Sequence, residues 1–289
     1  MLTGLLRLAA QLPLSVLHAL GGALGWLVYL CAPTYASRLR ENLLQSGLWN
    51  DTADFQRLLH ENIAQAGKAA AELPAVWFRP QAQAASLIKR VHGWESIEAT
   101  RAAGKGVIFL TPHLGCFEIL PQWITLRMPV TVLYRPPKLR WLEPVMLVGR
   151  TRPNMTATGT DLSGVRMLLK ALRRGEGVGI LPDQAPGTGE GEWADFFGRP
   201  AYTMTLALKL SESTGAPIVL TWALRLPGGR GFEASFEPLP APLPGESAAR
   251  QLNRALEAVI RRCPQQYLWS YNRYKTPRGV RPPDAHDGH

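Results

Sequence analysis

The sequence predicts an α/β fold, a layered sheet flanked by helices and preceded by an apolar helix. From residue 91 onward, short apolar runs alternate with amphipathic stretches of about ten residues, a pattern typical of strands joined by crossover helices. The first 33 residues are much more hydrophobic than the remainder. The chain has 289 residues, of which 46% are apolar and 19% charged, so it can bury a sizeable core.

We expect the N-terminal segment, residues 1–33, to be a membrane anchor or a deeply embedded interfacial helix. Its apolar run, Leu14–Ala32, spans 19 residues, close to the ~20 that a helix needs to cross a bilayer. Gly21, Gly22 and Gly25 weaken this run. A core-packed or monotopic amphipathic helix and a cleaved signal peptide therefore stay open as alternatives. If the segment spans, the arginines shortly after it favour a cytoplasmic location for the rest of the chain.

Residues 34–276 are expected to form one domain, and residues 277–289 a flexible polar tail. The domain opens with helices up to about residue 90, where Asp51 is a candidate N-cap at the head of an apolar stripe. The expected strands are 106–110, 130–134, 177–182, 218–224 and 232–236. The expected helices between and after them are 93–103, 117–127, 162–174, 203–214 and 248–262.

The chain is basic, because lysine and arginine exceed aspartate and glutamate by ten. An excess of this size favours an anionic partner, whether nucleic acid, an anionic membrane surface, a phosphorylated substrate or an acidic protein. The three cysteines, Cys31, Cys116 and Cys263, are odd in number and far apart. They make neither a disulfide framework nor a CxxC metal motif, which is typical of a reducing compartment.

An ionisable pair, His113 and Glu118, stands where an expected strand runs into a helix. Pro121 places the helix start near residues 116–118, since proline is tolerated only where its missing N–H is not needed. A carboxylate in this first turn can accept a hydrogen bond from His113 and orient the ring as a general base. The alternative is a structural histidine beside a glutamate at a helix terminus.

Two other chemistries at this turn have less support. Cys116 is a candidate nucleophile, but three residues of spacing give no assurance that it meets His113. A metal site formed by His113, Glu118 and Asp183 would have no recognisable ligand spacing. We therefore keep the acid–base pair as the principal hypothesis.

Two further strand ends carry polar residues. Tyr134 and Arg135 follow one expected strand, and Asp183 and Gln184 follow another. Because the carboxyl ends of parallel strands form the ligand crevice of an open α/β sheet, we expect these side chains to share a rim with His113. The planar fork of arginine suits a phosphate or carboxylate, although a surface arginine is the alternative. The glycine-rich stretch that follows is long enough to form a lid.

With these residues the sequence resembles the lipid A late acyltransferases, the lauroyl and myristoyl transferases of lipid A biosynthesis. They are a branch of the glycerolipid acyltransferases with an H-x4-E motif, which here is His113-Leu-Gly-Cys-Phe-Glu118. The likeness continues in order through Tyr134–Pro136, Gly164–Arg166, Leu172–Glu176, Pro182–Gln184, Phe196–Gly198, Thr214–Pro217 and Gln266–Lys275. One departure is Cys116-Phe117, where many members have Asn-Trp.

The resemblance implies a glycerolipid-acyltransferase-like sheet and an O-acyltransferase activity. A fatty acyl chain would pass from an acyl carrier protein thioester, or from coenzyme A, to a hydroxyl of a phosphorylated lipid A precursor. His113 would act as the general base, oriented by Glu118, with no cofactor and no metal. The enzyme would work at the cytoplasmic face of the inner membrane with acyl carrier protein as partner and no nucleic acid.

Other site residues follow from the same resemblance. Arg135 and Arg166 would bind the acceptor's phosphates. The thioester carbonyl would also need an oxyanion donor, and the strand-to-helix turn makes the backbone N–H groups of residues 114–116 the candidates. Asp183 and Gln184 would bind sugar hydroxyls or hold Arg135. The implied substrate-binding residues are Gly115, Cys116, Tyr134, Arg135, Arg166, Asp183 and Gln184. The alternatives are a same-fold acyltransferase acting on a lysophospholipid, aminolipid or glycan, and a basic membrane-surface protein that binds lipid without catalysis.

Overall fold

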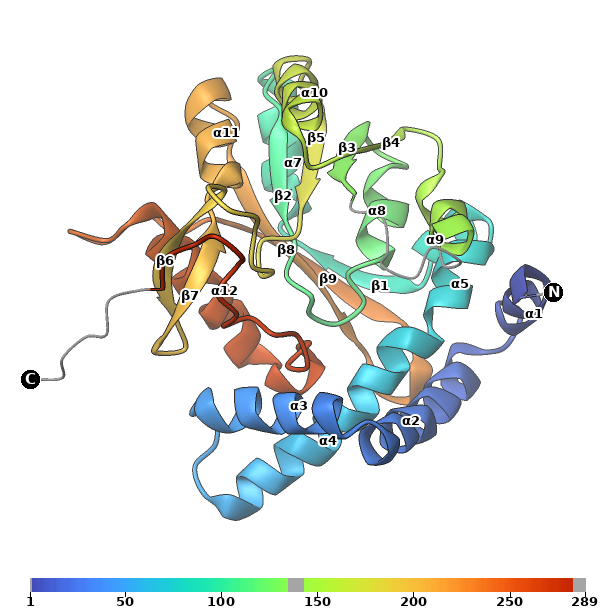
Figure 1. Ribbon diagram of the computed structural model, residues 1–289. Coiled ribbons are helices and arrows are strands. Elements are labelled where there is room, and N and C mark those ends of the chain that lie inside the picture. The colour runs from blue at the N-terminus through green and yellow to red at the C-terminus, as the bar shows by residue number, and fades with distance from the viewer. Residues whose placement is uncertain (1, 135–142, 283–289) are drawn as a thin grey trace, which may run out of the picture.

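A seven-stranded sheet forms the centre of the computed structural model, which describes residues 2–134 and 143–282 (Figure 1). The strand order is β1-β9-β8-β2-β5-β3-β4, and all neighbours are parallel except the antiparallel pair β8 and β9. The strands are β1 (Ile88–His92), β2 (Val107–Leu110), β3 (Val130–Leu133), β4 (Met155–Thr158), β5 (Gly177–Ile180), β8 (Ile218–Arg225) and β9 (Phe232–Pro238). The predicted α/β class is confirmed.

Helices cover both faces of this sheet, and the buried core therefore consists of two clusters, one on each face. They are α7 (Trp94–Ala102), α8 (Ile119–Ile124), α9 (Glu143–Arg150), α10 (Leu162–Arg173), α11 (Leu206–Thr214) and α12 (Ala248–Arg262). Along β2, Ile108 and Leu110 join one cluster while Val107 and Phe109 join the other. All four side chains are buried, because a strand covered on both faces has no solvent side. This is why β2 reads as an unbroken apolar run.

The N-terminal helices pack on one another and on the sheet domain. They are α1 (Leu2–Ala9), α2 (Leu14–Cys31), α3 (Pro33–Gln45), α4 (Thr52–Ala71), α5 (Leu73–Phe78) and α6 (Gln81–Ala85). The expected N-cap of α4 is confirmed, since the Asp51 carboxylate accepts from the N–H of Asp54 at 2.8 Å. The stripe behind it, from Phe55 to Ile63, is buried as the sequence predicted.

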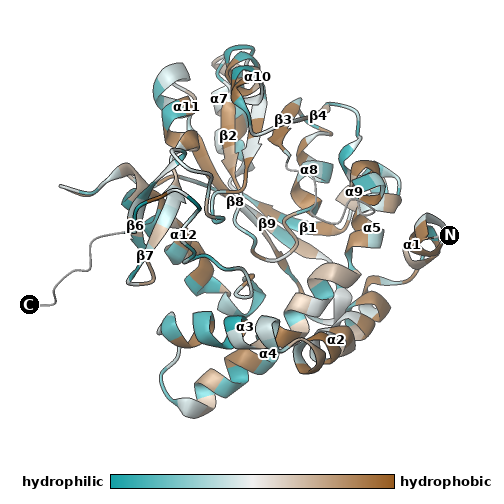
Figure 2. Cartoon of the chain, viewed as in Figure 1, coloured by the Kyte–Doolittle hydropathy of each residue, from teal (hydrophilic) through white to brown (hydrophobic). Residues whose placement is uncertain are grey.

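Helix α2 is long and apolar enough to cross a membrane by length and composition (Figure 2). One side of α2 packs closely on α4, where Gly25 and Gly67 meet and a Cβ on either would overlap the other helix's backbone. The opposite side leaves large apolar side chains exposed, among them Leu20, Leu24 and Leu27. The glycines that weaken the apolar run in sequence thus provide the contact between α2 and α4.

One expected boundary is wrong. The glycine-rich residues 185–190 are a loop that lines a cavity. Residues 191–204, which include the expected start of a helix at residue 203, instead form a hairpin of β6 (Gly191–Phe196) and β7 (Arg199–Met204). Helix α11 begins only at Leu206. Side chains from other parts of the chain hold the hairpin in place. Asn253 on α12 donates to the carbonyl of Asp195, and Arg273 donates to the carbonyl of Tyr202. The short turns η2 (Pro227–Gly229) and η3 (Pro264–Gln266) complete the described elements.

Strands β1 and β4 were not expected, because each lies at an edge of the sheet and has exposed polar residues rather than an apolar run.

The tail predicted from residue 277 is described up to residue 282, where Trp193 donates to the carbonyl of Arg281. Residues 283–289 lie outside the described part of the chain.

Candidate active site

His113 meets Asp183 at the carboxyl edge of the sheet. Strands β2 and β5 are parallel neighbours in which Leu110 is paired with Ile180, and His113 and Asp183 each follow their strand by three residues. The His113 ring Nδ1 lies 2.7 Å from Asp183 Oδ1, and its backbone N–H donates to Oδ2 at 2.8 Å. The carboxylate therefore holds both the ring and the main chain of the histidine.

Asp183 is 2% exposed and surrounded by groups that favour its ionised form. Burial alone would raise the pKa of this carboxyl, but the charge and hydrogen bonds of His113, together with the charge of Arg273, hold it below the usual value. Burial and the charge of the nearby Asp183 carboxylate raise the pKa of the Tyr267 hydroxyl well above its usual value. A buried, ionised aspartate fixes the proton of His113 on Nδ1 and leaves Nε2 as the basic nitrogen.

The other ring nitrogen of His113 faces the amide of Gln184, whose Nε2 lies 3.2 Å from His113 Nε2. Phe117 packs edge-on against the imidazole, with ring centroids 4.7 Å apart. His113 is only partly buried, so Nε2 remains within reach of a bound molecule. The imidazole is thus held on three sides and open toward a cavity.

Glu118 does not orient His113, contrary to the sequence-based hypothesis. It stands at the N-cap of α8, as Pro121 predicted, but its carboxylate accepts from Trp77 Nε1 at 3.0 Å and from Arg150 Nη2 at 2.5 Å. Within residues 2–134 and 143–282, no hydrogen bond joins it to His113. The turn before α8 directs the two side chains to different partners. His113 meets Asp183 in the loop after β5, whereas Glu118 meets Trp77 from α5 and Arg150 from α9.

A cavity of about 760 Å³ opens beside His113. It extends from the loops after β2 and β5 and the end of β3 to α9, α10 and α11. Its polar or charged lining comprises His113, Arg150, Thr160, Asp161, Gln184, Glu190, Thr205 and Lys209. Its apolar lining comprises Leu133, Met146, Leu162, Val165, Leu181, Ala185, Pro186, Met204 and Leu206. The volume and the mixed lining suit an amphipathic ligand with a long apolar part.

The predicted oxyanion donors are already in use. The N–H of Leu114 donates to the carbonyl of Pro112, that of Gly115 to Gln266, and that of Cys116 to Ala223. Neither Gly115 nor Cys116 is among the residues that line the cavity. Both are buried behind the turn, so the structure does not support direct substrate contacts for them.

Cys116 is also unsuited to be a nucleophile. Its side chain is buried, and burial together with the charge of Glu72 raises the pKa of the thiol well above its usual value. A thiol that stays protonated is a poor nucleophile. The general-base arrangement around His113 is therefore the better supported chemistry.

The remaining predicted residues divide into three cases. Tyr134 directly follows β3 with its ring 5.3 Å from the Arg150 guanidinium, and its buried hydroxyl has no hydrogen-bond partner in the described chain. Arg166 is exposed on α10 and does not line the cavity, although its neighbour Val165 does. Arg135 lies outside the described residues.

Sequence reasoning missed two residues of the site, Arg150 and Tyr267. Arg150 is at the end of α9 and brings a cation into the cavity. Nothing local in the sequence marks it, because its partner Glu118 is 32 residues away. Tyr267 lies within Gln266–Lys275, one of the segments that carry the family likeness.

Comparison with known proteins gives one consistent result. A family model described as bacterial lipid A biosynthesis acyltransferase matches residues 1–276. The chain is 28% identical to the lipid A biosynthesis palmitoleoyltransferase of Escherichia coli (strain K12), over 94% of this chain and 89% of that protein. It is 28% identical to the lipid A biosynthesis lauroyltransferase of the same strain, over 96% of this chain and 91% of that protein. A lipid A biosynthesis acyltransferase of Haemophilus influenzae is also 28% identical, over 96% and 89%.

Proposed function

The chain belongs to the bacterial lipid A biosynthesis acyltransferase family, and from this premise we propose that it transfers a fatty acyl chain from a thioester donor to a hydroxyl of a lipid A precursor. Family membership makes it an O-acyltransferase and confirms the resemblance found in the sequence. The observation that carries the proposed mechanism is the His113–Asp183 pair, 2.7 Å apart at one wall of a cavity with a long apolar lining.

His113 serves as the general base in this mechanism. Its Nε2 takes the proton of the acceptor hydroxyl while the oxygen attacks the thioester carbonyl. The new carbon–oxygen bond forms, the carbon–sulfur bond breaks, and the proton passes from the imidazolium to the departing thiolate. Asp183 stabilises the imidazolium and fixes the ring, as the carboxylate does in hydrolase triads. General-base assistance of this kind contributes roughly 10²–10⁴ in rate.

Two basic residues of the described chain line the cavity, Lys209 and Arg150, and of these Arg150 is held by an ion pair. Its guanidinium lines the cavity and is held from behind by the Glu118 carboxylate, which Trp77 fixes in turn. We assign Arg150 to a phosphate of the lipid acceptor, because the arginine fork matches phosphate oxygens. Glu118 is then a positioning residue for Arg150, which accounts for both ionisable residues of the H-x4-E motif.

The apolar part of the cavity is the proposed site of the acyl chain. Leu133, Met146 and Val165 come from three different elements, and Met204 and Leu206 add further apolar lining. Such a lining offers van der Waals contact along a hydrocarbon chain without polar groups that would need partners. The position of the chain relative to His113 would bring the thioester carbonyl to the base.

A membrane location and an acidic acyl donor account for the surface of the molecule. Helices α1 and α2 expose Leu5, Leu8, Leu20, Leu27 and Leu30, which suits contact with the apolar part of a bilayer. The net charge of +10 favours an anionic lipid surface and an acidic protein such as acyl carrier protein. We therefore propose that the enzyme works at the cytoplasmic face of the inner membrane with acyl carrier protein as donor.

The decisive experiment is an acyl-transfer assay with purified protein. Acyl carrier protein thioesters and coenzyme A thioesters of several chain lengths are offered to a panel of acceptors, and products are identified by mass spectrometry. We expect one added acyl chain on the lipid A precursor, lost in His113→Gln. Transfer only to a lysophospholipid, an aminolipid or a glycan would overturn the proposed acceptor. Lipid binding without any transfer would overturn the proposed chemistry.

A further inference from the structure

A buried ion pair stands behind the turn that carries His113. The side chains of Glu72 and Arg225 are 1% and 2% exposed, and neither lines the cavity beside His113. We propose that Glu72 and Arg225 are positioning residues that hold the His113 turn in its productive place, and that His18 ties them to helix α2. This inference rests on the proposed function of His113 as the base.

Arg225 connects the ion pair directly to the turn. Its Nη2 donates to the carbonyl of Gly115 at 2.8 Å, and the same guanidinium donates to the two Glu72 oxygens at 2.8 Å and 2.6 Å. The planar guanidinium cannot rotate to serve one acceptor without leaving another. The Gly115 carbonyl is therefore fixed relative to α4 and α5, between which Glu72 lies.

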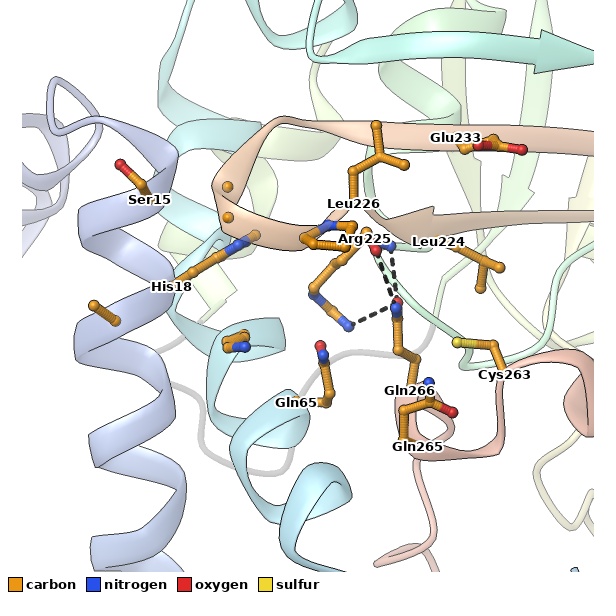
Figure 3. Close-up of a pocket in the computed structure, with 15 residues that line it drawn as sticks. Ser15, His18, Gln65, Leu224, Arg225, Leu226, Glu233, Cys263, Gln265 and Gln266 are labelled. Atoms are coloured by element: carbon orange, nitrogen blue, oxygen red, sulfur yellow. Dashed lines mark hydrogen bonds between the residues drawn. The ribbon is translucent and has the colours of Figure 1, made fainter. Parts of the chain in front are cut away.

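Gln266 holds the same turn from the other side. Its carbonyl accepts from the N–H of Gly115 at 3.0 Å. Its side-chain amide also bridges to the backbone of Arg225, with bonds of 2.8 Å and 3.1 Å that Figure 3 shows as dashed lines. Two residues beyond Gln266, the N–H of Leu268 donates to the carbonyl of His113 at 3.1 Å. His113 is thus hydrogen-bonded to the same segment whose position Arg225 and Gln266 fix.

The turn that carries His113 has little conformational freedom. Gly115 has a φ of +62°, a conformation that favours glycine. A Cβ there would overlap the carbonyl of Ala223 on β8, so the turn lies directly against that strand. A small displacement of Gly115 would therefore move His113, two residues earlier, rather than be absorbed by a flexible loop.

A contribution to the stability of the fold does not by itself explain why a buried ion pair stands at Glu72 and Arg225. Burying two charges costs free energy that their attraction only partly offsets, and apolar replacements of similar volume are often at least as stable. What an apolar pair cannot supply is the directed hydrogen bond from Arg225 to the Gly115 carbonyl. That bond gives the pair a role in placing His113.

His18 extends the network to α2. Its Nε2 lies 3.0 Å from Glu72 Oε2, and both side chains are buried. Because the other side of α2 carries the exposed leucines assigned to the membrane, the network joins the membrane-facing helix to the catalytic turn. The contacts from α2 to His113 run without interruption through His18, Glu72, Arg225 and Gly115.

The double variant Glu72→Leu/Arg225→Met separates positioning from stability. We expect it to remain folded, with a thermal midpoint close to that of the unaltered protein, while kcat falls about 10- to 100-fold at nearly constant KM. A folded double variant with full kcat would overturn the proposal. If the double variant does not fold, Arg225→Lys is used instead, because lysine keeps the charge but not the planar fork. A reduced kcat in Arg225→Lys would support the proposal, and a full kcat would overturn it.

A cavity beside Arg225 allows chemical rescue. It measures about 610 Å³ and lies between α2, α4 and the end of β8, with His18, Gln65 and Arg225 around it (Figure 3). In Arg225→Ala, guanidinium at millimolar concentration can enter and replace the lost donor. We expect partial recovery of kcat in Arg225→Ala and none in Arg254→Ala, whose partner Glu246 lies in a separate ion pair near the start of α12. Equal effects of guanidinium on both variants would contradict the proposed role.

A readout independent of acyl transfer completes the test. Diethylpyrocarbonate modifies neutral imidazole, and mass spectrometry measures its rate of reaction with His113. We expect this rate to change at least several-fold in the double variant but not in Arg254→Ala. An unchanged His113 rate would overturn the positioning role. Failure of the unaltered enzyme to transfer acyl chains would instead count against the proposed function alone, since the modification rate does not depend on it.

Discussion

His113 and Asp183 occupy equivalent positions on adjacent parallel strands, each three residues beyond the register pair Leu110 and Ile180. Both follow a proline that ends its strand, so both side chains emerge at the same edge of the sheet. The 2.7 Å contact between them is thus a consequence of strand order. It brings together the proposed base and its proposed orienting carboxylate, which lie 70 residues apart in the chain.

Replacing Asp183 by asparagine tests this pair. Asparagine keeps the shape but loses the charge that stabilises the imidazolium. It also loses one of the two acceptor oxygens that serve the ring and the backbone N–H of His113, so we expect kcat to fall by about 10²- to 10⁴-fold with little change in KM. Initial rates with a saturating thioester donor measure the effect. Asp195→Asn, an exposed change on β6, is the matched control. Near-normal turnover in Asp183→Asn would remove Asp183 from the mechanism.

Replacing Glu118 by glutamine tests the assignment of Arg150. The carboxylate accepts from Trp77 and Arg150 with separate oxygens, whereas glutamine is neutral and has a single acceptor oxygen. Loss of the charge-assisted bond to Arg150 costs about 1.5–3 kcal/mol, so the guanidinium is no longer fixed in the cavity. We expect KM for the phosphorylated acceptor to rise about 10- to 100-fold. A dephosphorylated acceptor should show a much smaller rise. Equal effects on both acceptors would argue that Glu118 acts on His113 after all.

The strands that carry the site could be predicted from sequence, but the partner of His113 could not. Buried strands covered on both faces, such as β2 and β5, appear as short apolar runs ended by proline. Their adjacency in the sheet is a property of the whole topology and leaves no local trace. The recurrence of a polar residue after each strand was the available signal, and it located Asp183 at the correct edge.

Glu118 shows the limit of arguments from spacing. Pro121 correctly located the start of α8, and with it the backbone of Glu118. The direction of its side chain depends on Trp77 and Arg150, which arrive from α5 and α9. The hairpin of β6 and β7 was missed for a similar reason, because its stability comes from contacts with α12 and Arg273 rather than from its glycine-rich approach.

Acid should destabilise the protein through Asp183 and Glu72, because the pKa of each is lower in the folded protein than its usual value of 3.8 or 4.5. The unfolded chain then binds more protons in acid, so the stabilisation is fully present above about pH 5 and is lost as the pH falls through the folded pKa values. We expect the thermal midpoint to be nearly flat from pH 7 to 5 and to drop below pH 4. Asp183→Asn should reduce the slope below pH 4, as measured by circular dichroism melts. An unchanged slope would show that Asp183 does not contribute to acid unfolding.

The length of the acyl chain should depend on Val165, which faces the cavity from α10. Val165→Phe places a ring in the space proposed for the acyl chain, while His113 and Asp183 stay in place. Because one methylene more or less in an apolar pocket changes discrimination by about 10-fold or more, we expect kcat/KM to shift toward a shorter thioester by at least that factor. Competition between thioesters of different length, read by mass spectrometry, measures the ratio directly. Met167→Phe is the matched control, since Met167 is exposed on the same helix and does not line the cavity. A uniform loss of rate at every chain length in Val165→Phe would place the acyl chain elsewhere.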